Sequence, residues 1–146
     1  MAATVHEVAS LLGFSESASR SMSPIQLIHL IEDGLPLSAL ERVSLRVSPQ
    51  DANFKYRIVP RATLARRRKP GKEKLQTGEG DRLVRLARVW SFAQEVWGSE
   101  ADARAFFFRA HPLLEGRLPI DVVLASELGA ELVNGILGQL KYGTAA

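Results

Sequence analysis

The stretch that decides the fold is TGEGDRLVRLARVWSFAQEVWG, which spans residues 77–98. After the glycine-containing break at residues 77–80, apolar side chains recur every three or four positions, which is the spacing of one face of an α-helix. Gly98 then supplies a residue of the kind that commonly ends helices. This pattern predicts the longest helix of the chain, with its apolar stripe in the core. The stripe consists of Leu83, Leu86, Ala87, Trp90, Ala93 and Trp97.

Start and stop signals on both sides of this segment predict further helices. Ser23 and Pro24 are typical of a helix start, Gln26 can complete a capping box, and Gly34 supplies a stop. By the same signals and by apolar spacing, we expect helices after Pro36, Ser48, Pro60, Ser99 and Pro119, and along residues 128–141. Alternating strand patterns are scarce, so we predict an all-α fold.

The first 22 residues are rich in alanine and serine and show little apolar periodicity. Four apolar residues allow a short helix there, and a frayed segment is an equal alternative. These residues are Val5, Val8, Leu11 and Leu12. We predict a weakly structured arm over residues 1–22.

Length and composition exclude several classes of protein. The 146 residues leave room for one domain or two small ones, and 46% hydrophobic with 24% charged residues is typical of a globular chain. The absence of cysteine excludes disulfides, thiolate metal sites and cysteine nucleophiles. The sequence has no apolar run long enough for a membrane span and no secretory signal at its start. We therefore expect a cytoplasmic protein without a membrane partner.

Patterns typical of catalysis or cofactor binding are missing from the sequence. His6, His29 and His111 include no pair with the spacing of a helical zinc site. The glycines at 78 and 80 lack the preceding strand and the third glycine of a dinucleotide loop. There is no phosphate-binding loop and no nucleophile elbow, and the carboxylates are scattered. We predict that the protein is not an enzyme and holds no metal or cofactor.

The formal charge of +3 hides a strongly basic segment. Between Lys55 and Lys74 lie nine basic residues and a single acidic residue, Glu73, whereas the rest of the chain is net acidic. Such a segment is typical of contact with a polyanion, but it also occurs on ordinary solvated surfaces and against acidic protein partners. Charge alone leaves these alternatives open.

Residues 48–69 have the length and order of a helix–turn–helix, whose second helix enters the major groove of DNA. Leu64 would pack inward, while polar side chains face base edges and further cations lie near phosphates. The DNA-binding candidates are Lys55, Arg61, Thr63, Arg66, Arg67, Arg68 and Lys69. If about five phosphates were neutralised, log affinity would fall with log salt with a slope of about −4 to −5. The alternative is a surface helix whose arginines only increase solubility.

Four motifs follow one another along the chain: PRATLARRRK at 60–69, DRLVRLARV at 81–89, HPLLEGRLPID at 111–121 and LKYGTAA at 140–146. In this order and spacing they resemble the Xre-type antitoxins of RES–Xre toxin–antitoxin modules, the ParS/MbcA-like group. The third motif is similar to that group's N-P-x-L-x-G-x-x-P-x-(D/E) signature, and the fourth is similar to its tyrosine–glycine C-terminus. The resemblance covers residues 23–146.

The resemblance implies a helix–turn–helix-like domain over 23–80 and a small helical toxin-binding domain over 81–146, whose core the long stripe would form. It also implies a RES-domain partner that consumes NAD, either by degrading it or by transferring ADP-ribose to a protein. In this group the C-terminal end of the antitoxin blocks the NAD pocket of the toxin. Carried onto this chain, the toxin-binding residues are Lys141, Tyr142, Gly143, Thr144, Ala145 and Ala146.

The chemistry of this tail is compatible with the implied role. Gly143 and the two terminal alanines are slim enough to enter a cleft, and Tyr142 could act as a rigid anchor. The terminal carboxylate could meet cations that normally hold the phosphates of NAD. The expected second activity is autorepression by a homodimer that binds operator DNA. The alternative is a free-standing dimeric helix–turn–helix regulator without a toxin partner.

The sequence departs from the pattern of the group at four positions. His111 replaces the usual asparagine and Glu115 a common glycine, while Arg57 and Val59 stand where a turn glycine and an N-cap serine are frequent. Loss of the serine cap costs about 1 kcal/mol, and loss of the glycine can distort the turn that orients the second helix. We therefore expect the departures to affect DNA recognition more than toxin binding.

Overall fold

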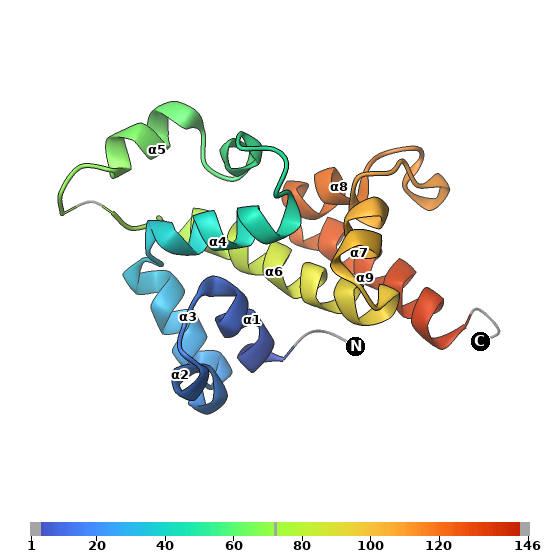
Figure 1. The fold of residues 1–146 in the computed structure, drawn as a ribbon, viewed down its shortest axis with the longest axis horizontal. Coiled ribbons are helices and arrows are strands. Elements are labelled where there is room, and N and C mark those ends of the chain that lie inside the picture. The colour runs from blue at the N-terminus through green and yellow to red at the C-terminus, as the bar shows by residue number, and fades with distance from the viewer. Residues whose placement is uncertain (1–3, 72, 144–146) are drawn as a thin grey trace.

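The computed structural model describes residues 4–71 and 73–143, and within these ranges every regular element is a helix (Figure 1). The predicted all-α fold is confirmed. The elements are α1 (Val5–Leu12), α2 (Glu16–Ser21), α3 (Pro24–Asp33), α4 (Leu37–Val47), the 3₁₀ helix η1 (Phe54–Arg57), α5 (Arg61–Arg67), α6 (Thr77–Trp97), α7 (Glu100–Phe107), the 3₁₀ helix η2 (Pro112–Leu114), α8 (Pro119–Ala125) and α9 (Glu127–Tyr142).

Helix α6 is the centre of the fold and packs against α1, α3, α4, α7, α8 and α9. Its predicted stripe is buried as far as Ala93, and Trp90 is fully buried. Because helices cover α6 on several sides, Val89 and Phe92, which lie off the stripe, are buried as well. Trp97, on the last turn, is 39% exposed, so the final residue of the stripe is not in the core.

The buried apolar side chains form one continuous core that runs from α1 to α9. The domain boundary predicted between residues 80 and 81 falls inside α6. The two predicted domains therefore share this helix and, with it, a common core.

The break predicted at residues 77–80 is wrong, because α6 begins at Thr77. Gln76 and Glu79 form a reciprocal capping box at its N-terminus. In it, the backbone N–H of Gln76 donates to Glu79 Oε1 at 2.8 Å. Gly80 lies inside the helix because α3 passes closely, and a Cβ there would lie 3.3 Å from Cγ2 of Ile31. The glycine marks a close helix contact rather than a turn.

The weakly structured arm predicted for residues 1–22 is also incorrect over residues 4–21, which form α1 and α2. Thr4 and Ser15 cap these helices by accepting backbone N–H groups, and Gly13 ends α1 with a φ of 101°. Val8 and Leu12 are buried in the common core. The polar residues that suggested disorder are therefore partly helix caps.

The helix expected after Ser48 is replaced by turns and the short η1. Ser48 is the C-cap of α4 instead of the N-cap of a new helix. The side chain of Asp51 accepts the backbone N–H of Asn53 at 2.9 Å, which stabilises a turn that competes with helix formation. The first helix of the predicted helix–turn–helix is thus only the four-residue η1, whereas the second is present as α5.

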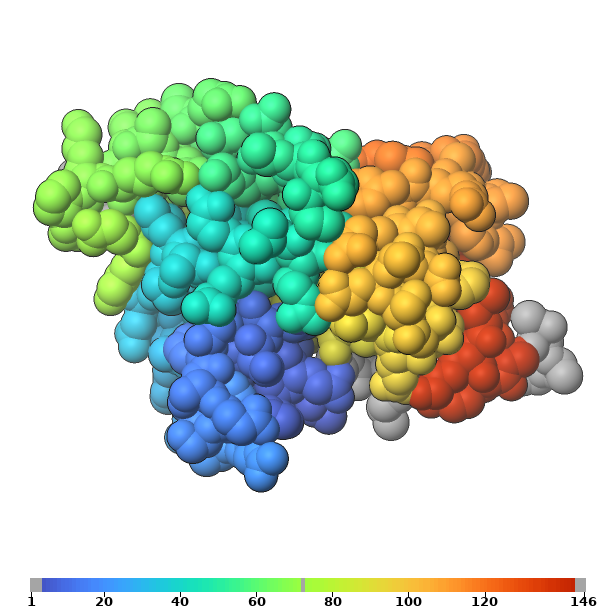
Figure 2. Space-filling model, viewed as in Figure 1, coloured from blue at the N-terminus to red at the C-terminus, as the bar shows by residue number. Residues whose placement is uncertain are grey.

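The chain places α5 and the end of α9 far apart. In Figure 1, α5 lies at one end of the long axis of the molecule and the C-terminal end of α9 at the other. Figure 2 shows the green segment that contains α5 along one edge of the surface, and the orange and red C-terminal segments on the opposite side. The body of the fold therefore separates the predicted DNA-binding residues on α5 from Lys141 and Tyr142, the predicted toxin-binding residues that lie on α9.

Candidate functional site

Helix α5 is attached to the core through few apolar contacts. Leu64 is its single fully buried side chain, and Ile58 and Val59 are buried just before it. Arg82 of α6 donates to the carbonyl oxygen of Ile58 at 2.6 Å and so fixes the approach to the helix. Pro60, at the N-cap position, makes no side-chain capping bond. The N-cap thus lies at Pro60 itself and not at Val59, where the sequence pattern placed it, and the first turn of α5 has no side-chain cap.

The predicted DNA-binding residues differ in how far their charges are already neutralised. Lys55 Nζ and Arg68 Nη2 both pair with Glu41 Oε1 of α4, each at 3.0 Å. Arg61 donates to the side-chain oxygen of Asn53 at 3.1 Å, and its guanidinium lies 4.1 Å from the centre of the Tyr56 ring. These contacts order the basic surface but leave less free charge than the sequence suggested.

Arg67 has a structural contact that the sequence did not reveal. Its guanidinium binds Glu79 of α6 through two nitrogens, one at 3.1 Å from Oε2, and donates to the carbonyl oxygen of Lys74 at 3.3 Å. Both side chains are at most 15% exposed. Arg67 therefore connects the end of α5 to the start of α6, and its charge is already neutralised by Glu79.

Three of the predicted DNA-binding residues remain available at the surface. Among the described residues, Arg61, Arg66 and Lys69 are exposed and have no acidic partner. Thr63 is half-buried, and its hydroxyl accepts a long hydrogen bond of 3.5 Å from Arg66. The structure thus brings the predicted set together on α5 and around it. Arg66 and Lys69 are exposed cations of this set without an acidic partner among the described residues.

At the other end of the molecule, α9 carries the predicted toxin-binding residues away from the core. Lys141 pairs with Glu95 of α6, and its Nζ lies 5.5 Å from the centre of the Tyr142 ring. Tyr142 is 66% exposed, and Gly143 follows with a φ of 85°, which favours glycine. The remaining predicted residues, Thr144, Ala145 and Ala146, lie outside the described part of the chain.

The step-of-four leucine pattern on α9 lies largely at the surface. Leu128, Leu132 and Leu140 are 68%, 55% and 49% exposed, whereas Ile136 is buried. The core side of α9 consists of Gly129, Ala130, Val133, Ile136 and Leu137. Large exposed apolar side chains that cluster on one element are typical of a partner interface.

The arginines of the 81–89 motif join the two halves of the fold. Arg85 donates to the carbonyl oxygens of Val123 and Leu124 at the end of α8, at 3.3 and 3.4 Å. Arg88 pairs with Glu127 at 2.8 Å, and Arg85 approaches the same carboxylate at 3.5 Å. Burial lowers the pKa of Arg85 from its ordinary value, while Glu127 opposes this change. These residues act in assembly of the fold, a role that local sequence patterns did not reveal.

The structure shows how three residues that depart from the pattern of the group are accommodated. His111 Nδ1 accepts the backbone N–H of Leu113 at 3.1 Å, so histidine takes over the capping role of a short polar residue at the start of η2. Glu115 has a φ of 56° and a ψ of 36°, the left-handed region in which glycine is favoured. Arg57, in the place of a turn glycine, pairs with Asp121 of α8 at 3.1 Å.

Over residues 4–71 and 73–143, no cluster of histidine and carboxylate side chains could hold a metal ion. No helix in the same residues has the length and apolar character needed to cross a membrane.

Comparison with known families gives two matches that together cover most of the chain. Residues 26–88 match the antitoxin Xre-like helix-turn-helix domain. Residues 92–143 match the antitoxin Xre/MbcA/ParS C-terminal toxin-binding domain. A search of curated proteins found no match. Both family matches include part of α6, and the second contains Lys141, Tyr142 and Gly143.

Proposed function

The chain belongs to the Xre-type antitoxins, and from this premise we propose that it neutralises a RES-domain toxin that consumes NAD. Its C-terminal segment, residues 141–146, would enter the NAD pocket of the toxin and exclude the dinucleotide. Inhibition of this kind needs shape and charge complementarity and no catalytic group of the antitoxin. The family has helix–turn–helix and toxin-binding domains and is not an enzyme family.

The observation that carries this proposal is how α9 ends. In its last turn, Lys141 pairs with Glu95 of α6. Tyr142 projects from this ordered turn with 66% of its surface exposed. A rigid aromatic side chain on an ordered support loses little conformational entropy on binding. Tyr142 is therefore well suited to anchor the segment in a cleft.

Beyond Tyr142, small residues complete the segment. A glycine, a threonine and two alanines have little side-chain volume and could follow a narrow path into a pocket built for a dinucleotide. Occupation of the pocket by these residues would compete directly with the substrate.

The test is removal of the segment from the full chain. A variant that lacks residues 142–146 is mixed with the RES-domain protein that we expect to be encoded next to this chain, and NAD consumption is measured at saturating antitoxin. We expect NAD consumption to be restored because the pocket is open, while the melting temperature of the antitoxin stays within a few degrees of the parent value because Tyr142 is outside the core.

A matched control separates occlusion from simple length. In it, residues 142–146 are replaced by five alternating glycine and serine residues. This chain has the parent length but lacks the aromatic anchor, and we expect weak inhibition. Full inhibition by the shortened chain would contradict the proposed function, as would the absence of any NAD-consuming activity in the neighbouring protein.

We further propose that a homodimer of the chain binds operator DNA through α5 and represses its own transcription. The match to a helix–turn–helix domain supports this activity, as do the exposed side chains of Arg61, Arg66 and Lys69. Contacts of arginine and lysine with phosphates release counterions, so affinity should fall steeply with salt. A DNA-binding antitoxin of this kind would act in the cytoplasm.

The DNA-binding proposal is tested with Arg66→Ala in a titration of upstream DNA at several salt concentrations. If Arg66 contacts one phosphate, the slope of log affinity against log salt should become less negative by about 0.9. Toxin inhibition should be unchanged, since α5 lies far from the end of α9 (Figure 1). An unaltered affinity and slope would remove Arg66 from the DNA interface.

The rival function is a free-standing dimeric regulator whose C-terminal half only dimerises. The match of residues 92–143 to a toxin-binding domain favours the antitoxin. Deletion of residues 142–146 distinguishes the two functions. In an antitoxin it abolishes inhibition of the toxin, whereas in a regulator without a toxin partner it changes neither folding nor DNA binding.

A further inference from the structure

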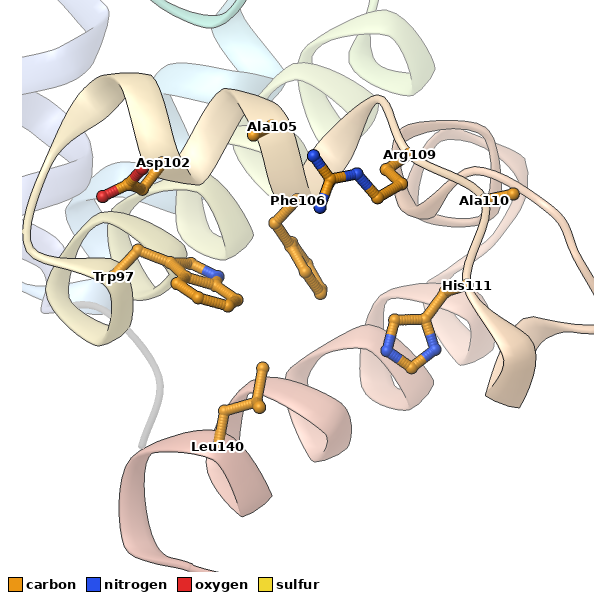
Figure 3. Close-up of a pocket in the computed structure, with 8 residues that line it drawn as sticks. All are labelled: Trp97, Asp102, Ala105, Phe106, Arg109, Ala110, His111 and Leu140. Carbon is orange, nitrogen blue, oxygen red and sulfur yellow. The ribbon is translucent and has the colours of Figure 1, made fainter.

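A cleft of about 300 Å³ lies between α7 and the C-terminal part of α9 (Figure 3). Figure 3 shows Trp97 and Phe106 on one side of this cleft and Leu140 and His111 on the other. The lining residues are Trp97, Asp102, Ala105, Phe106, Arg109, Ala110, His111 and Leu140. All of them lie within the match to the toxin-binding domain.

The walls of the cleft are apolar and include exposed aromatic surface. The rings of Trp97 and Phe106 are 6.0 Å apart, and Trp97 is 39% exposed. Leu140, which is 49% exposed, faces them from α9. A cavity of roughly 150 Å³ is enough for a benzene-sized group. The cleft therefore has room for one aromatic or branched aliphatic side chain, and exposed tryptophan is the residue most often found at the energetic centre of an interface.

The two ends of the cleft differ in charge. Arg109 and His111 lie at one end, and Asp102 lies at the other end beside Trp97 (Figure 3). Among the described residues, neither Arg109 nor Asp102 has an ion-pair partner. Because His111 Nδ1 accepts a backbone hydrogen bond, the neutral ring carries its proton on Nε2 and can donate it. The end with Arg109 and His111 thus offers donors to a carboxylate.

We propose that this cleft is a second docking site for the toxin and receives an apolar side chain next to an acidic residue of that protein. This inference rests on the proposed insertion of residues 141–146 into the toxin. Leu140 directly precedes this segment. Because an α-helix rises about 1.5 Å per residue, Tyr142 lies only about 3 Å further along the axis of α9 than Leu140. A toxin that encloses residues 141–146 must therefore stand against the wall of the cleft. The cleft then provides affinity, while the terminal segment provides occlusion.

The proposal is tested by Trp97→Ala and Arg109→Glu in the full chain, with the neighbouring RES-domain protein as the binding partner. Loss of a central aromatic anchor should raise the dissociation constant by roughly 30-fold or more. Reversal of the Arg109 charge should raise it by about tenfold, with a smaller effect at high salt. At saturating concentration both variants should still block NAD consumption, because their terminal segments are intact.

Two control variants show that these losses are local. Leu45→Ala removes a side chain that is 65% exposed on α4, and Arg20→Glu reverses an exposed charge on α2. Both lie outside the match to the toxin-binding domain, and both should bind the toxin as tightly as the parent chain. Melting curves of all four variants check that the fold is retained.

A spectroscopic measurement gives an independent readout. The chain has two tryptophans, so a 5-fluorotryptophan-labelled antitoxin gives two ¹⁹F resonances that single substitutions assign. Addition of unlabelled toxin should shift the resonance of Trp97 strongly and that of the buried Trp90 little.

The outcomes distinguish this inference from the proposed function. If Trp97→Ala and Arg109→Glu bind the toxin with parental affinity, the docking site is wrong while tail occlusion stands. If the substitutions change only the sedimentation coefficient of the antitoxin alone, the cleft holds a second copy of this chain and the inference is again wrong. If the shortened chain still inhibits, the proposed function fails whatever the cleft does.

Discussion

The two ends of the molecule hold their surface helices by different forces. Helix α5 has seven residues, one fully buried side chain and a set of ion pairs that reach α4 and α6. Helix α9 has sixteen residues and packs a continuous apolar face against α6 and α8. The exposed Arg68–Glu41 pair contributes little and is screened by salt, whereas apolar burial is not screened. We therefore expect the α5 end to be the less stable one.

This difference also shows how to interpret charge. The basic segment appears in the sequence as a dense cationic run, yet Glu41 and Glu79 already bind three of its members. The α9 end looks in the sequence like an ordinary helix with a leucine pattern, yet it exposes the larger apolar surface. A count of basic residues therefore overestimates the number of cations that are free to contact DNA. A periodic apolar pattern underestimates the apolar surface that remains exposed to a protein partner.

The largest effect is expected for Trp90→Ala, which tests whether the two ends share one core. Trp90 is fully buried in the middle of α6, and removal of such a side chain typically costs about 3–5 kcal/mol in the free energy of unfolding. Because α6 contacts helices of both halves, denaturant unfolding followed by circular dichroism should remain a single transition. The matched control is Trp97→Ala, with a much smaller loss. Two separate transitions would show that the halves are independent.

The next largest effect is expected in α9. A Cβ at Gly129 would overlap the carbonyl oxygen of Val122, so Gly129→Ala forces α8 and α9 apart and should cost about 1–3 kcal/mol. At Gly135, on the same helix, a Cβ would meet no atom within 4 Å. Gly135→Ala should therefore raise stability by about 0.5–1 kcal/mol through helix propensity. Equal effects of the two substitutions in thermal denaturation would contradict the close crossing of α8 and α9.

A smaller loss, about 1–2 kcal/mol, is expected for Arg67→Ala at the α5 end. The substitution leaves Glu79 without its partner at a site where both side chains are at most 15% exposed. Arg66→Ala, one residue away, removes an exposed side chain and should change the free energy of unfolding by less than about 0.5 kcal/mol. Urea titrations at low and high salt measure both. A larger loss in the free energy of unfolding for Arg66→Ala than for Arg67→Ala would contradict the structural role assigned to Arg67 and the DNA contact proposed for Arg66.

The smallest effect is expected for Glu115→Gly in the turn that follows η2. Glu115 has the only positive φ among the non-glycine residues that the structure describes. Glycine removes the steric cost of this conformation but adds backbone freedom to the unfolded chain. The net result should be a gain of no more than about 1 kcal/mol, measured as a raised melting temperature. A clear loss would mean that the Glu115 side chain has a stabilising contact.

Local signals predicted those parts of the fold that local physics decides. The caps at Ser23 and Ser99 and the stop at Gly98 are where the sequence placed them, because each depends on residues within one helical turn. The serines and threonine near the N-terminus had the same capping role, but without a strong apolar pattern they suggested an unstructured arm. The Asp51 turn after Ser48 imitated a helix start for a similar reason.

The candidate sites were predictable only in part, because they depend on contacts between distant residues. The Arg67–Glu79 and Arg68–Glu41 pairs join residues 12 and 27 positions apart, and no periodicity reveals them. The spacing of Leu128 and Leu132 predicts a helix, but which side of that helix is covered depends on where α6 and α8 lie. The family resemblance predicts the terminal segment as a site, and this stays a prediction, whereas the cleft beside Trp97 appears only when α7 and α9 are in place.

The position of α6 has a consequence for how such proteins can evolve. The helix is about 30 Å long, at 21 residues and about 1.5 Å per residue. The first matched domain ends within it, at residue 88, and the second begins within it, at residue 92. A recombination event that joined the front of one such gene to the back of another inside this helix would pair two unmatched halves of a single core. Exchange of partners by shuffling whole modules is therefore obstructed, and gradual substitution at the surface of residues 92–143 is the physically easier route to a new partner.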